Sequence, residues 1–441
     1  MSKLIESKKS STCDVKTKSF TVASEKLNKI LTKEERKTDG IYFTPFETRK
    51  MLLDITLPYI SDIYDTTDDI NFLEPSCGSG EFIHDLHRIY PDYNITGVEL
   101  NKKVFEKTKE EFEDEPNITL ENIDFMEYEN DEKFNVIIGN PPFCVNKEKY
   151  PDYDKKCMSG RGNLFVLILF KCLVDHLKPG GILSFILPTS FYNCSYYQKC
   201  RTYIHKNMTI LNITNINSKF FDTKQEVMIF TVRSRGISPY DPLIEKTSKT
   251  IKKGVVGGNT SYVVKLSKDN IYFSPHYKRL IELTKGCDYL KNIGFTVKTG
   301  SIVWNQVKDK LSTDGTLLIY SSNIIDGVLK IDKDNELSEK KVKKQYINIK
   351  TKIPLNEPSI LINRGYGNKY CFKYCLIDDI GEYFVENHIN VITRNEDTKI
   401  ALSDIINSFN DERTEEFIKL FVGNGSMSKT EIETILPIYL L

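Results

Sequence analysis

The sequence predicts an α/β protein in which a parallel, doubly wound sheet is followed by a second domain of mixed α+β type. Short apolar runs alternate with amphipathic stretches from about residue 38 to 235, and strands that alternate with helices indicate parallel pairing through helical crossovers. After about Arg235 the chain becomes rich in Ser, Gly and Thr, and then in irregular Lys-containing segments. The first 30 residues are polar and lack clear periodicity. We therefore expect a flexible tail at 1–30, a first domain at 31–238 and a second domain at 239–441.

The elements of the first domain follow from apolar runs of strand length and from longer periodic stretches. In chain order we expect a strand at 71–73, a helix at 82–90, a strand at 95–100, a helix at 102–112, strands at 118–121 and 134–138, a helix at 164–177 and a strand at 182–187. The last of these helices should stop at Pro179-Gly180-Gly181, because proline and glycine end helices. The runs 211–216 and 227–232 have no helix between them and should form a strand pair at one edge of the sheet.

The second domain shows strand-like runs at 262–266, 316–320, 359–362 and 389–393, and a helical stretch from about 402. Its charge is uneven, since residues 245–373 hold 24 Lys and Arg against 12 Asp and Glu, whereas acidic residues dominate from 374 to 441. The formal net charge of the whole chain is +0, which hides this basic stretch. A positive field on one face attracts nucleic-acid phosphates. A solvated surface with uneven charge is the alternative interpretation.

Cysteine and histidine usage argues against a disulfide framework and a metal site. The ten cysteines are scattered, and no CxxC occurs. His84 and His87 have the i,i+3 spacing of one helix face, and this pair without a third ligand is more typical of surface or hydrogen-bonded histidines than of a metal site. Unpatterned cysteines in a chain of this length are typical of a reduced, intracellular protein. The most apolar run, residues 164–174, is too short to span a bilayer. We expect a soluble intracellular protein with no metal and no membrane partner.

A glycine motif follows the first strand and opens the next helix, in the stretch Phe72-Leu73-Glu74-Pro75-Ser76-Cys77-Gly78-Ser79-Gly80. Ligands of open α/β sheets bind at the carboxyl ends of the strands, and Gly78 and Gly80 allow a tight turn and close approach. The motif is neither GxGxxG nor a P-loop with its Lys, so a dinucleotide or a triphosphate does not fit. Glu74 suits a cationic ligand with an amino-acid portion, and Ser76 and Cys77 belong to the same loop. A turn that uses glycines for its shape alone is the alternative.

Two further acids stand at successive strand ends. Glu99 and Leu100 are at the end of the second strand, and Glu99 lies nineteen residues past Gly80, where such folds hold a ribose diol. Asp124-Phe125 follows the third strand. Its carboxylate can accept from an adenine amino group, and its ring can cover the base. Each signal is weak alone, but together the three acids indicate a ligand made of a nucleoside and an amino acid.

The loop Gly139-Asn140-Pro141-Pro142-Phe143, after strand 134–138, indicates the chemistry. An exocyclic amine on an aromatic base is a poor nucleophile, because its lone pair is delocalised into the ring. The side-chain oxygen of Asn140 and the carbonyl of Pro141 could accept its two N–H bonds and localise that lone pair. The Pro-Pro pair would fix this carbonyl, and Phe143 would stack on the base. A rigid turn after a strand is the alternative when the loop is taken alone.

Together with the preceding segment Asp39-Gly40-Ile41-Tyr42-Phe43-Thr44-Pro45, these motifs resemble the gamma-type DNA adenine-N6 methyltransferases of type II restriction-modification systems. The resemblance is close over about 38–235 and extends to the C-terminal half in arrangement and in fragments such as Asn363-Arg364-Gly365-Tyr366-Gly367. It implies a Rossmann-like sheet that binds S-adenosylmethionine, releases S-adenosylhomocysteine and needs no metal. It also implies a C-terminal target-recognition domain for double-stranded DNA, and a monomer in a bacterial cytoplasm or a virus-infected host cell.

The resemblance also implies roles for single residues. Tyr42 and Thr44 would close over the methionine end of the cofactor, where Thr44 could donate to its carboxylate, and Asn140 and Pro142 would border the cofactor as well. Phe221, in Lys219-Phe220-Phe221-Asp222, would be the second aromatic that holds a flipped-out base, with a core phenylalanine as the alternative. Phe143 stands where the family more commonly has tyrosine, which keeps the stacking face and loses a hydroxyl.

Several other functions use the same loop. Release-factor methyltransferases apply an Asn-Pro-Pro-aromatic loop to a glutamine amide, but they lack a large C-terminal domain. An RNA adenine-N6 methyltransferase, a DNA cytosine-N4 methyltransferase and a DNA-recognition module without catalysis are further alternatives. The large second domain and the intact Asp124 and Asn140 favour a DNA methyltransferase. We expect it to act on adenine N6, with the base flipped out of the duplex.

Overall fold

The structure is a computed structural model that describes residues 20–32, 34–36, 40–65, 68–145, 150–160, 162–216, 226–235, 262–265, 270–331, 345–365, 370–422 and 425–440. The chain forms two compact units. The first comprises Met1–Leu187 and Thr214–Val255, and the second comprises Pro188–Ile213 and Val256–Leu441. Residues 188–213 group with the C-terminal part of the chain. The expected boundary at 238/239 falls within 236–261, outside the described residues, and stays a prediction.

A seven-stranded sheet has the strand order β3-β2-β1-β4-β5-β7-β6. Its strands are β1 (Phe72–Glu74), β2 (Ile95–Val98), β3 (Ile118–Glu121), β4 (Phe134–Gly139), β5 (Leu177–Pro188), β6 (Met208–Ile216) and β7 (Val227–Ser234). β1 pairs in parallel with β2 and β4, β2 with β3, and β4 with β5. The parallel, doubly wound sheet expected from the sequence is confirmed. Strand β4 is buried along its whole length, which is typical of a central parallel strand.

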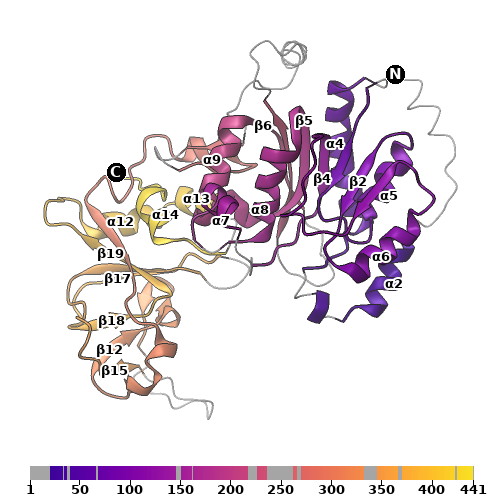
Figure 1. The fold of residues 1–441 in the computed structure, drawn as a ribbon. Coiled ribbons are helices and arrows are strands. Elements are labelled where there is room, and N and C mark those ends of the chain that lie inside the picture. Colours follow the sequence, from indigo (N-terminus) through magenta and orange to yellow (C-terminus); the bar gives the residue numbers. More distant parts are fainter. Residues whose placement is uncertain are drawn as a thin grey trace. The chain divides into compact units, whose positions relative to one another are not determined.

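Helix α4 (Phe46–Ile63) precedes β1, and further helices lie between several of the following strands (Figure 1). They are α5 (Glu81–Ile89), α6 (Lys102–Glu111), α7 (Pro151–Cys157), α8 (Leu164–Lys171), α9 (Gln198–Asn207) and the short 3-10 helices η2 (Thr189–Tyr192) and η3 (Ser195–Tyr197). Helix α5 begins directly after Gly80, which has a φ of 73°. The side chain of Asn101 caps α6 by accepting from the backbone N–H of Val104 at 3.2 Å. Both helices therefore start at the sheet edge where β1 and β2 end.

An N-terminal helix, α2 (Val22–Ile30), stands where the sequence suggested a flexible tail. Its Leu27 and the following Leu31 are buried, and they pack with Val104 of α6. Figure 1 shows α2 beside α6. The expected tail is therefore ordered from Thr21 onward, because apolar side chains at positions 23, 27 and 31 form one buried stripe.

The helix expected at 164–177 is present but has two parts. Helix α8 ends at Lys171 and passes into a π-helical turn, η1 (Cys172–His176). Strand β5 begins at Leu177, before the Pro179-Gly180-Gly181 stretch that was expected to end the helix, and runs through that stretch. Phe134 of β4 pairs with Leu177 of β5, whereas Val136 pairs with Ile182, so the register shifts between these two pairs. The shift accommodates the additional residues of β5 between Leu177 and Ile182.

The second unit contains two four-stranded sheets, with strand orders β10-β19-β16-β17 and β11-β15-β12-β18. The first sheet is made of β10 (Phe295–Thr299), β19 (Ile389–Arg394), β16 (Ser359–Asn363) and β17 (Tyr374–Ile377). The second sheet is made of β11 (Leu311–Ser312), β15 (Tyr346–Ile347), β12 (Thr316–Ile319) and β18 (Tyr383–Val385). Two small ribbons pair β8 (Val263–Val264) with β9 (Tyr272–Phe273), and β13 (Ile324–Ile325) with β14 (Val328–Leu329).

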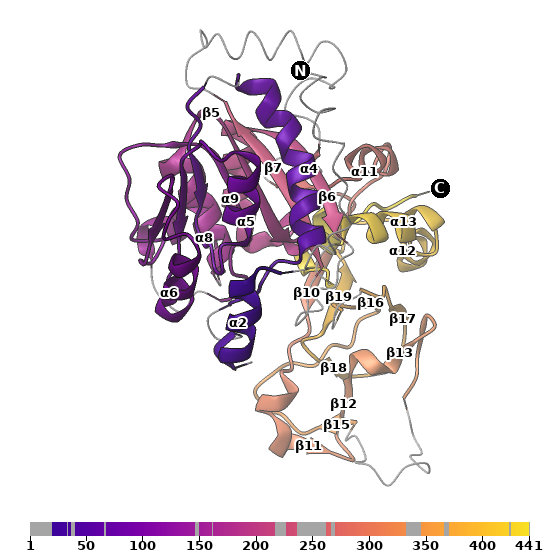
Figure 2. The ribbon, with the colours of Figure 1, turned by 90° about the vertical axis from the view of Figure 1, so that its right-hand side faces the viewer.

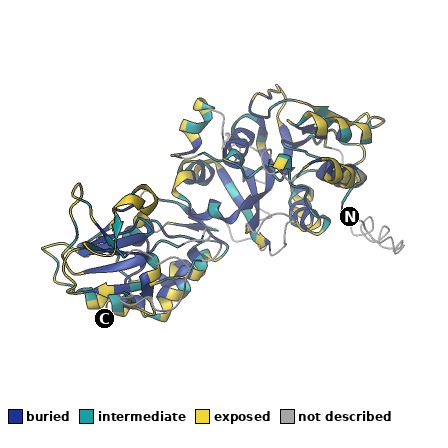
Figure 3. Cartoon of the chain, turned by 90° about the horizontal axis from the view of Figure 1, so that it is seen from below, coloured by how far each residue is buried: buried dark blue, intermediate teal, exposed yellow. Residues whose placement is uncertain are grey.

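Helices α11 (Tyr277–Leu283), α12 (Leu402–Phe409), α13 (Glu412–Phe421) and α14 (Lys429–Thr434) complete this unit, with the 3-10 helices η4 (Trp304–Gln306), η5 (Lys308–Lys310) and η6 (Ser321–Asn323). One core joins the helices to the first sheet through residues such as Ile405, Phe417 and Ile392. Figure 2 shows α12 and α13 at the end of the unit away from β12 and β15. Buried strands and outward-facing exposed helix surfaces are visible in Figure 3. The α+β character expected of this part is confirmed.

Candidate active site

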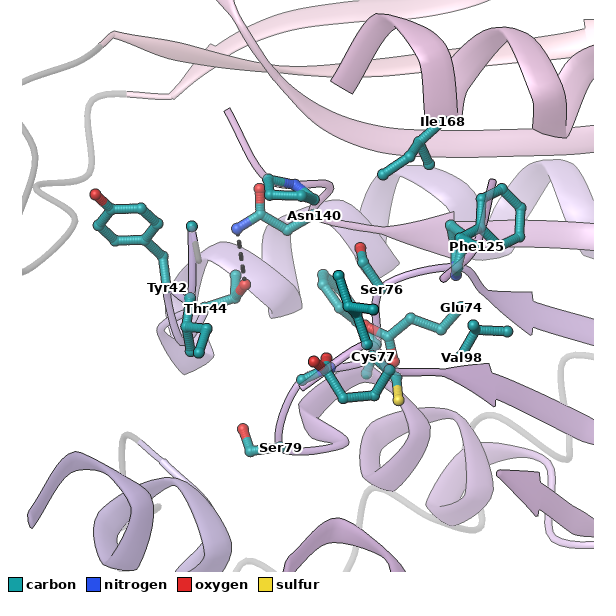
Figure 4. A pocket seen from close by; sticks show the side chains of 18 of the residues that line it. Tyr42, Thr44, Glu74, Ser76, Cys77, Ser79, Val98, Phe125, Asn140 and Ile168 are labelled. Carbon is teal, nitrogen blue, oxygen red and sulfur yellow. Dashed lines mark hydrogen bonds between the residues drawn. The ribbon is translucent and has the colours of Figure 1, made fainter. Parts of the chain in front are cut away.

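A pocket lies at the carboxyl ends of β1, β2 and β4 and at the segment after β3, inside the first unit (Figure 4). In-register pairing of Glu74 with Gly97 brings the ends of β1 and β2 to the same edge. The lining residues are Gly40 to Thr44, Glu74 to Ser79, Glu81, Phe82, Val98 to Leu100, Ile123 to Phe125, Asn140, Pro142, Leu164 and Ile168. The three predicted carboxylates and the predicted catalytic amide thus share one cavity.

The two glycines of the motif do different work. Gly78 has a φ of 53°, and a Cβ added to it would meet nothing within 4 Å, so its backbone is open to a close ligand. Gly80 has a φ of 73°, and a Cβ there would lie 2.6 Å from Cε2 of Phe112. Gly80, which was predicted to bind the ligand, is not among the lining residues. Its role in the structure is to let the turn pack against α6.

Glu74 is 3% exposed, and its Oε2 accepts no hydrogen bond among the described residues. Burial raises the pKa of this carboxyl well above its usual range, and Arg49 acts against that shift. The nearby acids Glu81 and Glu99 raise the pKa of Glu74 further. An acid in this state gains from a cationic ligand, because a nearby positive charge favours its ionised form.

Glu99 is held by the backbone on both carboxylate oxygens. The N–H of Gly78 donates to Oε2 at 2.9 Å, and the N–H of Asn101 donates to Oε1 at 2.7 Å. These contacts join the glycine loop to the start of α6 and fix the direction of the carboxylate. Each oxygen keeps further acceptor capacity for a hydroxyl of a ligand. Leu100, which follows Glu99, lines the pocket while 63% exposed.

Asp124 and Phe125 form the third part of the pocket. Asp124 accepts the N–H of Met126 at 2.9 Å on Oδ1 and the hydroxyl of Tyr150 at 2.7 Å on Oδ2. Phe125 is 4% exposed and packs against Tyr128 and His176, with ring centroids 5.9 and 5.3 Å away. The side chain of Asp124 is therefore oriented from two sides, and the ring of Phe125 is a fixed wall of the cavity.

A buried cation supports this wall from behind. Lys171 is 0% exposed, and its Nζ donates to the carbonyl of Met126 at 2.9 Å and to Oε1 of Glu129 at 3.0 Å. The same ammonium lies 6.0 Å from the ring centroid of Phe125. His176 lies nearby, and burial, followed by the charge of Lys171, lowers its pKa to about 4. The one charged residue of the apolar run is thus used to hold the segment after β3.

Asn140 stands at the end of β4 with its amide held on one side. Its Nδ2 donates to Oγ1 of Thr44 at 3.1 Å (Figure 4). Its Oδ1 is buried and accepts no hydrogen bond from any described residue. A buried amide oxygen without a partner costs free energy unless a ligand supplies one. The arrangement therefore leaves an acceptor available for a donor that the protein itself does not provide.

The segment before α4 closes over the same loop. Gly40 has a φ of 69°, and a Cβ added to it would lie 2.9 Å from Cβ of Pro142. Tyr42 and Thr44 line the pocket with it, as predicted from the sequence. Ser76 and Cys77 also line the pocket, and Oγ of Ser76 has no hydrogen-bond partner in the described chain. Close packing of Gly40 on Pro142 explains why a glycine stands there.

Two predicted residues of the catalytic loop do not line the pocket, and one further predicted residue lies outside the described part of the chain. Pro141 is buried and Phe143 is half-buried, and neither belongs to the lining residues. The ring of Phe143 packs edge-on against Phe165, with centroids 6.0 Å apart. Phe221 lies in 217–225, outside the described residues. The stacking roles of Phe143 and Phe221 and the acceptor role of the Pro141 carbonyl therefore stay predictions.

Sequence reasoning missed a buried ion cluster beside the pocket, centred on Arg49 of α4. Its Nη1 lies 2.6 Å from Oε2 of Glu81 and donates to the carbonyl of Thr44 at 2.6 Å, and its Nε lies 2.7 Å from Oδ2 of Asp85. Ser24 of α2 donates to Oε1 of Glu81 and contacts Oγ of Ser79 at 2.6 Å. A Glu directly after the last glycine was the available signal. Apolar lining residues such as Ile123, Leu164 and Ile168 carried no signal, because they follow ordinary core patterns.

Within the described residues no group of three or more His, Cys, Asp or Glu side chains is placed to hold a metal ion. No helix in that part of the chain is long and apolar enough to cross a membrane.

Known proteins are similar in sequence to this chain over most of its length. The profile of the Eco57I restriction-modification methylase family matches residues 13–221. The type II methyltransferase M.CvrRI of Paramecium bursaria Chlorella virus XZ-6E is 30% identical over 429 residues, which are 96% of this chain and 100% of that protein. The modification methylase CviBIII of Paramecium bursaria Chlorella virus NC1A is 28% identical over 423 residues, covering 94% and 98%. A class I S-adenosylmethionine-dependent methyltransferase structure from Listeria monocytogenes superposes with a TM-score of 0.36, at 17% identity, over 46% of this chain and 69% of that one.

Proposed function

The chain belongs to the type II restriction-modification methyltransferases, and we propose that it methylates the N6 amino group of an adenine flipped out of duplex DNA. The cofactor is S-adenosylmethionine. The observation that carries the proposal is the buried, unpartnered Oδ1 of Asn140 in the same cavity as Glu74, Glu99 and Asp124. An acceptor kept without a partner next to a cofactor pocket suits a substrate that brings an N–H donor.

The residues of the pocket fit the cofactor part by part. Glu74, buried and with one unpartnered oxygen, complements a cationic amino-acid portion. Glu99 is oriented by two backbone N–H groups and can accept from ribose hydroxyls. The carboxylate of Asp124 can accept from the adenine amino group, and the ring of Phe125 can cover the face of the adenine. The open space at Gly78 allows a ligand to approach the backbone.

When bound, S-adenosylmethionine supplies an electrophilic methyl group on a sulfonium. The protein's part is to make the exocyclic nitrogen of the base nucleophilic. Oδ1 of Asn140 and the carbonyl oxygen of Pro141 accept hydrogen bonds from the two N–H groups of the amine. These two hydrogen bonds turn the lone pair of the nitrogen out of conjugation with the ring. The same two dipoles stabilise the positive charge that develops on nitrogen, and such preorganised dipoles commonly supply a large part of catalysis. Water can take the proton afterwards.

A basic surface of the second unit supports duplex DNA as the partner. It consists of the exposed Lys308, Lys310, Lys350 and Lys352 with Trp304 and Ile353. Lys308 lies 4.9 Å from the Trp304 ring centroid, and the N–H of Asn348 donates to the carbonyl of Lys310 at 3.1 Å, which brings the two segments together.

Two apolar side chains of this basic surface are exposed to solvent. Ile353 is 91% exposed and Trp304 is 39% exposed. Lysines flanking exposed apolar side chains are suited to a polyanion with apolar base edges, because the lysines release counterions from phosphates while apolar groups contact or wedge between bases. A small-molecule or peptide substrate gives no comparable reason for such a surface.

Incubation with tritiated S-adenosylmethionine and duplex DNA, total RNA or release factor tests the substrate class. We expect label in DNA, and nuclease digestion followed by mass spectrometry should show N6-methyladenine. Asn140→Ala is the matched control for contaminating activity, since the same preparation should then lose the label. Label in RNA or release factor alone, or as N4-methylcytosine, would overturn the assignment to adenine N6 of DNA.

A further inference from the structure

The hydroxyl of Thr44 contacts the nitrogen of the Asn140 side-chain amide, and the amide oxygen, to which the proposed function assigns the base, lies at the other end of the same group. Nδ2 of Asn140 donates to Oγ1 of Thr44 at 3.1 Å, while Oδ1 of Asn140 is buried and accepts from no described residue. If the amide turned by half a rotation, Nδ2 would face the amine, and two donors would meet. The function of Asn140 therefore depends on which end of its amide faces Thr44.

A hydroxyl alone does not settle that choice, because it can donate as well as accept. Thr44 is 5% exposed and lines the pocket, and no acceptor for its proton is recorded among the described residues. Once the Thr44 hydroxyl donates its hydrogen bond to a carboxylate in the pocket, the oxygen of Thr44 can only accept a further hydrogen bond. The amide nitrogen of Asn140 must then face it. A ligand that engages the hydroxyl thus fixes the amide in the productive orientation.

The backbone of Thr44 is itself anchored. Nη1 of Arg49 donates to its carbonyl at 2.6 Å, and Arg49 is fixed by buried contacts to Glu81 and Asp85. All three of these charged side chains are nearly inaccessible to solvent. The backbone that carries the hydroxyl is therefore held by the same buried cluster that includes Glu81, the residue directly after the glycine loop.

We propose that Thr44 is a positioning residue for Asn140. The hydroxyl of Thr44 couples binding of the cofactor carboxylate to the orientation of the Asn140 amide. The inference rests on the proposed function, since it assigns the acceptor role to Oδ1 of Asn140. It extends the predicted contact of Thr44 with the cofactor: one hydroxyl serves the cofactor and the catalytic loop at once.

Single-turnover methyl transfer at saturating cofactor measures the coupling. Thr44→Val removes the hydroxyl at nearly constant volume, and we expect the rate to fall about tenfold to a hundredfold, the range for a catalytic group displaced without being deleted. Thr44→Ser should recover most of that loss. Thr56→Val is the matched control, because Thr56 is also buried and lies in α4, the helix that begins two residues after Thr44. The hydroxyl of Thr56 is hydrogen-bonded to the carbonyl of Leu52 and to the hydroxyl of Ser184, and neither of these residues lines the pocket. The rate of Thr56→Val should stay within about twofold, as expected of a site without shared partners.

A double-mutant cycle separates action through Asn140 from any other role. In an Asn140→Ala background, Thr44→Val should change the rate by less than about twofold, since residues that act as a unit are not additive. If Asn140→Ala is too slow to time, Asn140→Ser replaces it, because serine has no amide for Thr44 to hold. An equal fold-loss in both backgrounds would show that Thr44 acts independently of Asn140, and would overturn the proposal.

Ligand binding gives a readout that does not depend on turnover. By calorimetry, Thr44→Val should weaken S-adenosylhomocysteine, which carries the carboxylate, by about tenfold, as for a lost hydrogen bond to a charged group. Methylthioadenosine, which lacks the amino-acid portion, should bind equally to both proteins and so confirms that the variant is folded. Equal binding of S-adenosylhomocysteine would contradict the coupling. A wild-type protein that labels no DNA would overturn the proposed function, whereas failure of the cycle or of the binding difference with an active wild type overturns this inference alone.

Discussion

Replacing Arg49 by methionine tests the frame beneath the pocket. The guanidinium contacts Glu81 at 2.6 Å, Asp85 at 2.7 Å and the carbonyl of Thr44 at 2.6 Å. The side chains of the two ion pairs are 4–5% exposed. Breaking a buried ion pair from one side leaves an uncompensated charge and costs about 3–5 kcal/mol. Two carboxylates would be left here, so we expect Arg49→Met to lower the free energy of unfolding of the first unit by at least the lower end of that range.

Urea unfolding followed by far-ultraviolet circular dichroism measures this loss. Trp304 is the only tryptophan of the sequence and lies in the second unit, so its fluorescence follows that unit separately. Arg88→Met is the control, because Arg88 approaches the same Asp85 at 3.8 Å while its own side chain is 62% exposed. Exposed pairs contribute about 0–1 kcal/mol, so this variant should unfold almost like wild type. A loss for Arg49→Met below about 1 kcal/mol, or equal to that of Arg88→Met, would refute the reasoning.

Three further predictions concern the pocket and the basic surface. Burial raises the folded-state pKa of Glu74. The ligand-free protein should therefore lose stability as pH rises through that raised pKa, and its affinity for the cofactor should increase over the same range. Glu74→Gln should abolish both trends, measured by thermal unfolding and calorimetry, and unchanged trends in this variant would contradict the assignment. Gly80→Ala should destabilise the first unit more than Gly78→Ala does, because both glycines have a positive φ but only a Cβ at position 80 would also lie 2.6 Å from Phe112. Gly78→Ala should in addition weaken binding of S-adenosylhomocysteine, because its Cβ would enter the open space beside the loop. A larger loss of melting temperature in Gly78→Ala than in Gly80→Ala would refute this division. Replacing both Lys350 and Lys352 by alanine should reduce the slope of log affinity for duplex DNA against log salt by about 2, as measured by fluorescence anisotropy, if each lysine contacts one phosphate; an unchanged slope would remove these lysines from the DNA surface.

The sheet and the residues at its edge could be predicted because each depends on local signals. Apolar runs located the strands, and the glycine motif with acids at three successive strand ends located the pocket. Glu74, Glu99, Asp124 and Asn140 indeed line one cavity. Parallel topology forces strand ends to one edge, so spacing along the chain becomes proximity in space.

What sequence reasoning missed depends on contacts between distant segments. The Arg49 cluster joins α4 to α5, and Ser24 of α2 reaches Glu81 across the chain. Hydrophobic periodicity does not predict which distant polar side chains pair. The short apolar stripe around Leu27 was also not predicted, because the surrounding N-terminal residues are mostly polar. The helix expected at 164–177 ends at His176, within one residue of its expected end, but its last five residues, Cys172–His176, form a π-helical turn that an apolar pattern does not reveal.

The central claim is that the oxygen of Asn140 makes a base amine nucleophilic, and one rate measures it most directly. Single-turnover methyl transfer to duplex DNA at saturating cofactor should fall about a hundredfold to a thousandfold in Asn140→Ala, as for the loss of one preorganised dipole. Calorimetric binding of S-adenosylhomocysteine by the same variant confirms a folded pocket. A folded, cofactor-binding Asn140→Ala protein that transfers methyl groups within about tenfold of the wild-type rate would contradict the account.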